Sequence, residues 1–173
     1  QCWHADDELR WIVAAISDTG CRMAEIVGLS KTDVRLDGDI PHISIRPRPW
    51  RRLKTVSSER DIPLVGSALW GLTRAYQSTN SEMLFPRYND GVSTNSNSAS
   101  AALSKWLKQQ TNPDCTMHSF RHSFRDRLRA VECPIELADA LGGWSTDGIG
   151  AAYGQGYSLQ LKQKWLSATV LKP

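Results

Sequence analysis

Cysteine is scarce in this sequence, and its four copies are scattered along the chain. Cys2, Cys21, Cys115 and Cys133 form no Cys-x-x-Cys pair and no cluster with histidines. The usual spacings of a structural zinc site are therefore missing, and a reduced, intracellular protein fits this use of cysteine best. Long apolar runs are missing too, since none approaches the roughly 20 residues that a membrane helix needs.

Acidic residues are not grouped in a way that predicts a metal site. One set lies at a predicted helix start and the other flanks predicted turns: Asp6, Asp7 and Glu8, then Asp33, Asp37 and Asp39. Metal-dependent phosphate chemistry normally needs converging carboxylates, and these two sets give no such convergence. The sequence therefore favours an activity that uses no metal.

The chain of 173 residues is long enough for one domain with a sizeable core, but a second full domain is not expected. Hydrophobic residues make up 40% and charged residues 23%, which is usual for a soluble globular protein. Its start lacks an initiator methionine and a signal-peptide pattern, so we expect a piece of a longer protein.

Positive charge is concentrated in two short stretches, although the net charge of the whole chain is only +3. The first stretch contains Arg46, Arg48, Arg51, Arg52, Lys54 and Arg60, and the second contains Arg121, Arg125, Arg127 and Arg129. Local clusters on a nearly balanced domain predict a focused anionic partner, such as a phosphate backbone. The candidate DNA-binding residues are Arg48, Arg51, Arg52 and Arg125.

Hydrophobic periodicity predicts a mainly α domain with one small antiparallel β-sheet, an α+β fold. Apolar residues recur on one helical face at Ile12, Val13 and Ile16, and Thr19-Gly20 ends this first helix. Further helices are expected at about 22–29, 66–77, 96–110, 117–130, 134–141 and 159–170. Short alternating strands are expected between residues 34 and 64, joined by an arginine-rich turn.

Attack on a DNA phosphate requires that charge on the non-bridging oxygens be neutralised and that the leaving oxygen receive a proton. Fixed cationic side chains can do this, and arginine suits the task because its planar fork donates two hydrogen bonds and stays protonated. His118 and Arg121 lie three residues apart, so on a helix they share one face. Taken alone, this pair is equally compatible with a solvated basic helix face, and Arg22 with Glu25 is more typical of a surface ion pair.

Four segments, in order, resemble the conserved boxes of the tyrosine recombinases, the phage integrase family. They are residues 19–26 (TGCRMAEI), 54–64 (KTVSSERDIPL), 118–122 (HSFRH) and 141–145 (LGGWS), the last followed by Tyr153 nine residues after Trp144. Each box is weak alone, but four in register over nearly the whole chain form a strong match. The resemblance implies the catalytic-domain fold of this family over residues 1–173, without the N-terminal DNA-binding domain.

The resemblance also implies a role for each matching residue. Tyr153 would attack the phosphate and form a 3′-phosphotyrosyl intermediate. Arg22 and Arg121 would clamp the non-bridging oxygens, and Lys54, on a mobile hairpin, would protonate the departing 5′-oxygen. His118 would take the phenolic proton or hydrogen-bond the phosphate.

Two further roles follow from the same resemblance. Trp144 would replace the commoner histidine and donate its indole N–H to the phosphate, since a tryptophan ring cannot shuttle a proton. Glu25 would orient the catalytic side chains without contacting the phosphate itself. Tyr157 is a rival nucleophile four residues after Tyr153, and the spacing from Trp144 favours Tyr153.

The implied activity is site-specific DNA recombination by strand cleavage and rejoining, as in a phage or genomic-island integrase, with neither a metal nor a nucleotide cofactor. The implied partners are double-stranded attachment sites, a homotetramer on DNA formed from free monomers, and accessory DNA-bending proteins; the implied location is the bacterial cytoplasm, at the nucleoid. No membrane partner is expected. Two alternatives remain open: a type IB topoisomerase, which shares this chemistry, and a DNA-binding relic that has lost activity.

Several other residues are better explained by structure than by catalysis. We expect a structural role for His122 and a buried position for Cys21, whereas packing and DNA contact are equally compatible with Trp50. The amphipathic segment 159–170 would pack between protomers by family resemblance, or else dock on its own domain.

Overall fold

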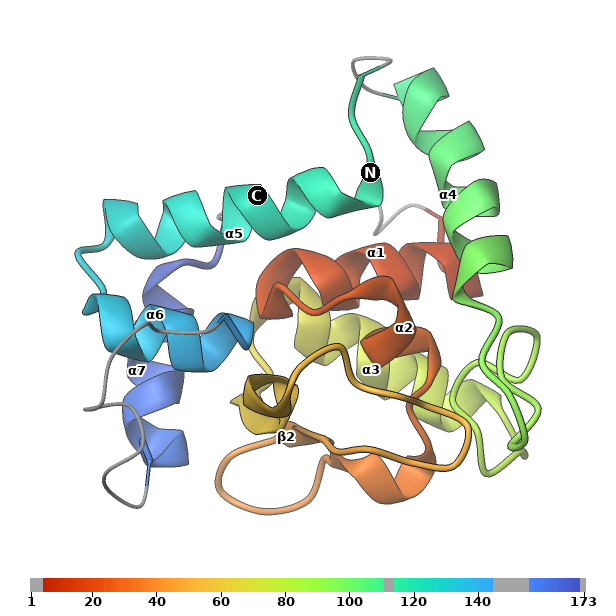
Figure 1. The fold of residues 1–173 in the computed structure, drawn as a ribbon, viewed down its shortest axis with the longest axis horizontal. Coiled ribbons are helices and arrows are strands. Elements are labelled where there is room, and N and C mark those ends of the chain that lie inside the picture. The colour runs from red at the N-terminus through yellow and green to blue at the C-terminus, as the bar shows by residue number, and fades with distance from the viewer. Residues whose placement is uncertain (1–4, 111–113, 145–155, 172–173) are drawn as a thin grey trace.

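The computed structural model describes residues 5–110, 114–144 and 156–171. Figure 1 shows helices arranged around a small sheet, and thus the mainly helical α+β fold expected from the sequence is confirmed. The helices are α1 (Glu8–Thr19), α2 (Met23–Val27), α3 (Gly66–Ser78), α4 (Ser96–Gln110), α5 (Met117–Ala130), α6 (Ile135–Gly142) and α7 (Leu159–Ala168). Two 3₁₀ helices, η2 (Lys31–Asp33) and η3 (Val56–Ser58), flank the sheet strands.

Helix α1 forms the centre of the core. Its start is capped by the Asp7 carboxylate, which accepts a hydrogen bond from the backbone N–H of Arg10. Its end is set by Gly20, which adopts a left-handed conformation (φ 63°) and donates its N–H to the carbonyl of Ile16. The buried face of α1 packs against both α3 and α5, and Figure 1 shows α5 lying above α1.

The sheet is antiparallel, in the order β1 (Val34–Arg35), β2 (His42–Ile45) and β3 (Arg60–Pro63). Ile43 and Ile45 alternate with half-buried residues on β2, and Ile43 pairs with Ile62 of β3. Apolar side chains therefore line the inner face, as the period of two predicts. The chain between β2 and β3 contains the arginine-rich turn, and it brings Lys54 to a cavity that Met23 and Ala24 of α2 also line.

Helix α2 is shorter than the predicted 22–29 because its two ends are fixed by specific contacts. Arg22 precedes the helix in extended conformation, and the Glu25 carboxylate accepts a hydrogen bond from its backbone N–H. At the other end Gly28 follows the last turn, and the chain then leaves to form a bridge between Ser30 and Met83. The ends of the other expected helices fall within two residues of their predicted positions.

Helix α7 docks on its own domain. It packs against β3, with Leu166 fully buried and the Lys162 ammonium donating to the carbonyl of Asp61 at 2.9 Å. The Arg127 guanidinium on α5 also donates to the carbonyl of Thr169, just past the end of α7. Of the two alternatives open for this segment, the described residues show internal docking.

Candidate active site

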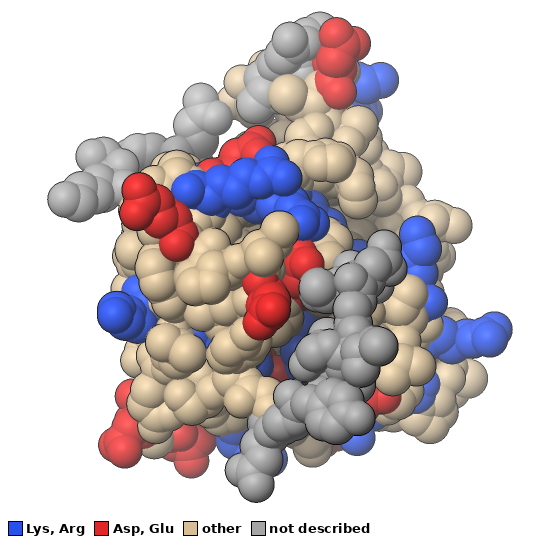
Figure 2. Space-filling view, turned by 60° about the vertical axis from the view of Figure 1, so that its left-hand side comes forward, with Lys and Arg blue, Asp and Glu red and all other residues tan. Residues whose placement is uncertain are grey.

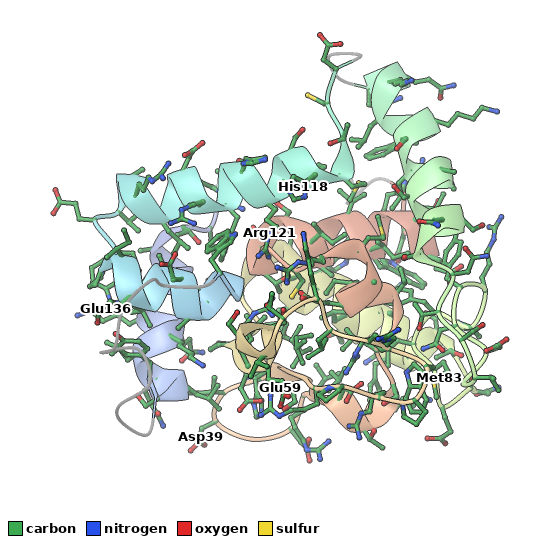
Figure 3. The ribbon with its side chains drawn as sticks, in the orientation of Figure 1. Asp39, Glu59, Met83, His118, Arg121 and Glu136 are labelled. Atoms are coloured by element: carbon green, nitrogen blue, oxygen red, sulfur yellow. The ribbon has the colours of Figure 1, made fainter. Side chains whose placement is uncertain are left out.

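An open cavity of about 360 Å³ brings together four of the predicted catalytic residues. Arg22 precedes α2, Lys54 lies in the chain before η3, and His118 and Arg121 lie on α5. All four side chains line this cavity, together with Ser100 of α4. Figure 3 shows His118 near the start of α5 and Arg121 further along the same helix, above α1 and α2. Segments up to about 100 residues apart in sequence thus meet at one site.

Arg22 is held in place by two acceptors. Its Nη1 donates to Glu25 Oε1 at 2.8 Å and to Ser58 Oγ at 3.0 Å, and a quarter of its side chain remains exposed. These bonds fix the guanidinium between α2 and η3, beside the cavity. The residue therefore offers a preorganised positive charge to a ligand in the cavity.

Glu25 is buried, with 3% of its side chain exposed, and it is not a surface ion-pair partner. Burial by itself raises the pKa of this carboxyl, but the charge and hydrogen bond of Arg60, and the bonds from Arg22, hold the pKa below its ordinary value. Glu25 is therefore ionised near neutral pH and is shared by two arginines. The expectation of an ordinary surface pair, drawn from the sequence alone, is wrong for Glu25.

Arg121 is almost completely buried, and its two terminal nitrogens differ in their hydrogen bonding. Its Nη1 donates to the carbonyl of Gly20, whereas Nη2 has no hydrogen-bond partner within the described part of the chain. Burial, and then the charge of Arg22, lower the pKa of Arg121 to about 10. It stays protonated near neutral pH, and an anion in the cavity would offset both effects.

His118 is exposed at the cavity and is surrounded by positive charge. Its ring meets His122 edge to face, with centroids 4.8 Å apart. The pKa of His118 is lowered by partial burial and then by the charges of His122, Arg121, Arg22 and Lys54. The neutral imidazole is thus favoured near neutral pH, and it can accept a proton. His122, expected to be structural, is in fact exposed and influences His118.

Trp144 stacks between two guanidiniums outside the cavity lining. The carbon centres of Arg121 and Arg125 lie 4.7 and 4.6 Å from its ring centroid. Arg125 also pairs with Asp139 at 3.0 Å, so its charge is partly compensated. A side chain at Gly142 would overlap the indole, so this glycine makes room for it. Indole donation to a phosphate stays a prediction.

Of the two candidate tyrosines, Tyr157 lies among the residues that the structure describes. Tyr153, the predicted nucleophile, lies outside the described residues, within 145–155. The Tyr157 hydroxyl donates to Glu136 at 3.2 Å, and Figure 3 shows Glu136 at the opposite end of α6 from Arg121. Burial, and then its bond to Glu136, raise the pKa of Tyr157. Tyr157 is therefore engaged away from the cavity in this structure.

The arginine-rich turn is organised by a buried carboxylate. Asp33 accepts from Arg48 at 2.6 Å and from Arg51 at 3.0 Å, and the side chains of Asp33 and Arg51 are both fully buried. Arg51 also donates to the carbonyls of Gly28 and Arg46. The prediction that Arg51 contacts DNA is therefore wrong for this structure, because its guanidinium is buried and donates its hydrogen bonds to acceptors within the protein.

The residues near Arg51 differ from it in exposure and in hydrogen bonding. Arg52 is exposed, and a third of the Arg48 side chain is exposed, so a role in DNA binding stays a prediction for both. Trp50 donates its indole N–H to the carbonyl of Gly28 at 3.0 Å, which decides in favour of packing. Cys21 is buried as expected, and burial raises its thiol pKa to about 11.

Figure 2 shows basic side chains separated by acidic and uncharged ones on the side it presents. Within the described residues, no group of three or more histidine, cysteine or acidic side chains could hold a metal ion. No helix there is long and apolar enough to cross a membrane.

The described part of the chain is a mainly α domain with a small sheet, and it gathers two arginines, a lysine and a histidine at one cavity, a set of side chains that can bind an anionic group. The model of the phage integrase family matches residues 4–157, and this chain therefore belongs to that family. The tyrosine recombinase resemblance of the sequence is thereby confirmed.

One solved structure shares the fold. It is the Tn1549 transposon integrase in complex with transposon right end DNA, matched with a TM-score of 0.59 and 16% identity. The match covers 90% of this chain and 53% of the integrase chain, so the present chain spans about half the length of its relative. No curated protein matches the sequence.

Sequence reasoning missed one residue that the fold makes central, Arg60. The sequence pattern places Arg60 only in the first basic stretch and within the matching segment 54–64, and it predicts no separate role for this residue. In the structure Arg60 is buried and donates to Glu25 at 2.9 Å. The available signal was that Arg60 lies two residues before Ile62 on a predicted strand, so the two side chains share the face that is buried in the core.

Proposed function

We propose that this chain is the catalytic domain of a site-specific tyrosine recombinase that cleaves and rejoins DNA, as in the integration of a phage or genomic island. The observation that supports this most is the meeting of Arg22, Lys54, His118 and Arg121 at one cavity. These are the residues to which the family resemblance assigns the phosphate chemistry. The remainder of the full protein, including an N-terminal DNA-binding domain, is part of the same proposal.

The reaction would conserve the energy of the phosphodiester bond. The Tyr153 oxygen forms a bond to phosphorus while the bond from phosphorus to the 5′-oxygen breaks, giving a 3′-phosphotyrosyl link. His118 takes the phenolic proton, and Lys54 gives a proton to the departing 5′-oxygen. A 5′-hydroxyl of a partner strand then attacks the link and restores the DNA backbone in the reverse sequence of steps.

Arg22 and Arg121 stabilise the negative charge that develops on the non-bridging phosphate oxygens in the transition state. Both are preorganised by protein acceptors, so little reorganisation is needed when a phosphate enters. Arg121 Nη2, which has no hydrogen-bond partner among the described residues, can donate to a non-bridging oxygen. In this proposal the protein's own cations neutralise the transition state, and a tetramer on paired attachment sites exchanges the strands.

Covalent capture on a nicked suicide duplex carrying candidate attachment sites tests the proposal. The unmodified chain should form an adduct that maps to Tyr153, and Tyr153→Phe should abolish it while changing DNA affinity little. Tyr157→Phe is the matched control and should still form the adduct. An adduct of undiminished yield with Tyr153→Phe would contradict the assignment, and absence of any adduct in the unmodified chain would favour the inactive DNA-binding relic.

A second assay separates the recombinase from a topoisomerase of the same chemistry. Recombination between two sites requires strand exchange, whereas a type IB topoisomerase relaxes supercoils without exchanging partners. Recombinant products from two marked duplexes would support the integrase. Relaxation without recombinants would assign the chain to the topoisomerase alternative.

A further inference from the structure

Arg60 contacts three segments of the chain with one buried guanidinium. Its Nη2 donates to Glu25 Oε2 at 2.9 Å, its Nη1 to the carbonyl of Ser58 at 2.6 Å, and its Nε to the carbonyl of Leu141 at 2.9 Å. Only 3% of the side chain is exposed. A group this deeply buried can act on a ligand in the cavity only through its neighbours.

Two of these neighbours hold Arg22. Glu25 uses its Oε1 for Arg22 and its Oε2 for Arg60, so the two arginines share one carboxylate. Ser58 is shared as well, because its carbonyl accepts from Arg60 and its hydroxyl accepts from Arg22. Both acceptors that fix the Arg22 guanidinium are therefore themselves fixed by Arg60.

The third contact joins this cluster to the end of α6. Leu141 lies three residues before Trp144, the residue that stacks on Arg121. The intervening Gly143 is left-handed (φ 62°), and a side chain there would meet Arg60 Nη1 at 2.6 Å. The α6 terminus is therefore shaped around the Arg60 guanidinium, and a bulkier residue at Gly143 would displace it.

The charge of Arg60 also affects how much of the positive charge of Arg22 is available to a ligand. Glu25 carries one negative charge against two positive ones, so the cluster keeps a net positive charge beside the cavity. If Glu25 had Arg22 as its sole partner, their charges would cancel. The planar fork of Arg60 spreads its donors over three nitrogens and so reaches Glu25, Ser58 and Leu141 at once, whereas the donors of a lysine all lie on a single nitrogen.

We propose that Arg60 is a positioning residue: by fixing Glu25 and Ser58, it holds the Arg22 guanidinium at the cavity for a phosphate group. This inference rests on the proposed function in one respect, that the cavity takes a phosphate. It adds a residue that never touches the substrate and acts through its contacts to Glu25 and Ser58.

Titration with inorganic phosphate, followed by NMR on arginine Nε–Hε cross-peaks, tests the inference without requiring a DNA target. Arg60→Lys keeps the charge but loses the fork, so phosphate affinity should fall about threefold to tenfold. The Arg22 cross-peak should move towards that of an unrestrained arginine while the backbone peaks stay dispersed. The matched control is Arg46→Lys, at a half-exposed arginine paired with Asp61, which should bind phosphate like the unmodified chain.

Unchanged phosphate affinity in Arg60→Lys would overturn the inference, and so would absence of phosphate binding by the unmodified chain. If Arg60→Lys fails to fold, Ser58→Ala decides, because it keeps Arg60 and removes one acceptor of Arg22. Ser58→Ala should weaken phosphate binding, and unchanged affinity would count against the proposal. In the double variant the two losses should be less than additive, because both act through Arg22.

Adduct formation separates this inference from the proposed function. Weaker phosphate binding by Arg60→Lys, with no DNA adduct from the unmodified chain, would support the positioning role and contradict the recombinase. An adduct that forms equally fast with Arg60→Lys would support the recombinase and overturn the positioning role.

Discussion

Two buried carboxylates decide what the neighbouring arginines do. Glu25 is shared by Arg22 and Arg60 at the cavity, whereas Asp33 pairs with Arg48 and Arg51 in the turn. Arginines that look alike in the sequence therefore have different roles, because a buried carboxylate needs a cationic partner wherever the fold places it. At the scale of single residues, charge must be read together with burial.

The Arg51–Asp33 pair predicts a stability effect at a residue first expected to bind DNA. Arg51→Met removes one partner of a fully buried carboxylate, so the free energy of unfolding should fall by about 3 kcal/mol. Urea denaturation measures this change. The exposed neighbour gives the control, since Arg52→Ala should leave the urea midpoint unchanged. An Arg51 variant with normal stability and weakened DNA binding would contradict the structural role.

The environment of His118 predicts a pH dependence. Partial burial and surrounding positive charge lower its pKa, so an NMR titration should place its midpoint below the ordinary value of about 6.5. If His118 takes the phenolic proton, adduct formation should be constant near neutral pH and fall as pH drops through that lowered pKa. His122→Gln removes a neighbouring charge and should move the midpoint upwards. A midpoint at or above the ordinary value would refute this electrostatic account.

At the scale of elements, the helices follow from local signals. The Asp7 cap and Gly20 end of α1 lie where the sequence pattern places them, and the expected ranges of α4 and α5 agree with the structure. These signals act between residues close in sequence, so no knowledge of the fold is needed to interpret them. Helix α2 departs from expectation at its ends, because Arg22 is held in extended conformation by its bond to Glu25 and Gly28 follows the last turn.

The docking of α7 gives a prediction at the same scale. Leu166 is fully buried against the domain, so Leu166→Ala should lower the free energy of unfolding by about 3 kcal/mol. Because the contact lies within one chain, the loss should be the same at every protein concentration. Leu161→Ala, at a more exposed position on the same helix, should change the midpoint little. A thermal midpoint (Tm) that rises with protein concentration would instead indicate docking between chains.

At the scale of the whole molecule, net charge says little about DNA binding. The total is only +3, and acidic and basic groups alternate on the face in Figure 2. Three basic side chains are nevertheless gathered at one cavity, which Arg22, Lys54 and Arg121 line. Binding should therefore depend on a few phosphate contacts and be sensitive to salt.

This arrangement predicts a measurable salt slope. Fluorescence anisotropy on a labelled duplex should show affinity falling with salt, and Lys54→Ala should reduce the slope of log affinity against log salt by about one unit. Lys54 is exposed and lines the cavity, so its loss should remove one phosphate contact without unfolding the chain. Lys31→Ala, at a lysine bonded to the carbonyl of Thr79, is the control. Equal slopes for Lys54→Ala and the unmodified chain would place Lys54 away from the DNA.

The sequence alone was sufficient to predict the family, the helix ranges and four residues of the candidate site. Short motifs in a fixed order mark Arg22, Lys54, His118 and Arg121, which line one cavity in the structure, and the catalytic roles of these residues stay predictions. The sequence could not separate Arg51 from Arg52, because neighbouring arginines differ in burial only once the turn has folded around Asp33.

The amino-acid sequence by itself determined which groups carry charge and where helices begin and end, since both depend on residue type and near neighbours. Only the tertiary structure decided which charges meet. Arg60 contacts Leu141, 81 residues away, and Arg121 contacts Gly20, 101 residues away. Such contacts arise when the core closes and buried carboxylates and carbonyls take the nearest available donors, and no local pattern encodes that choice.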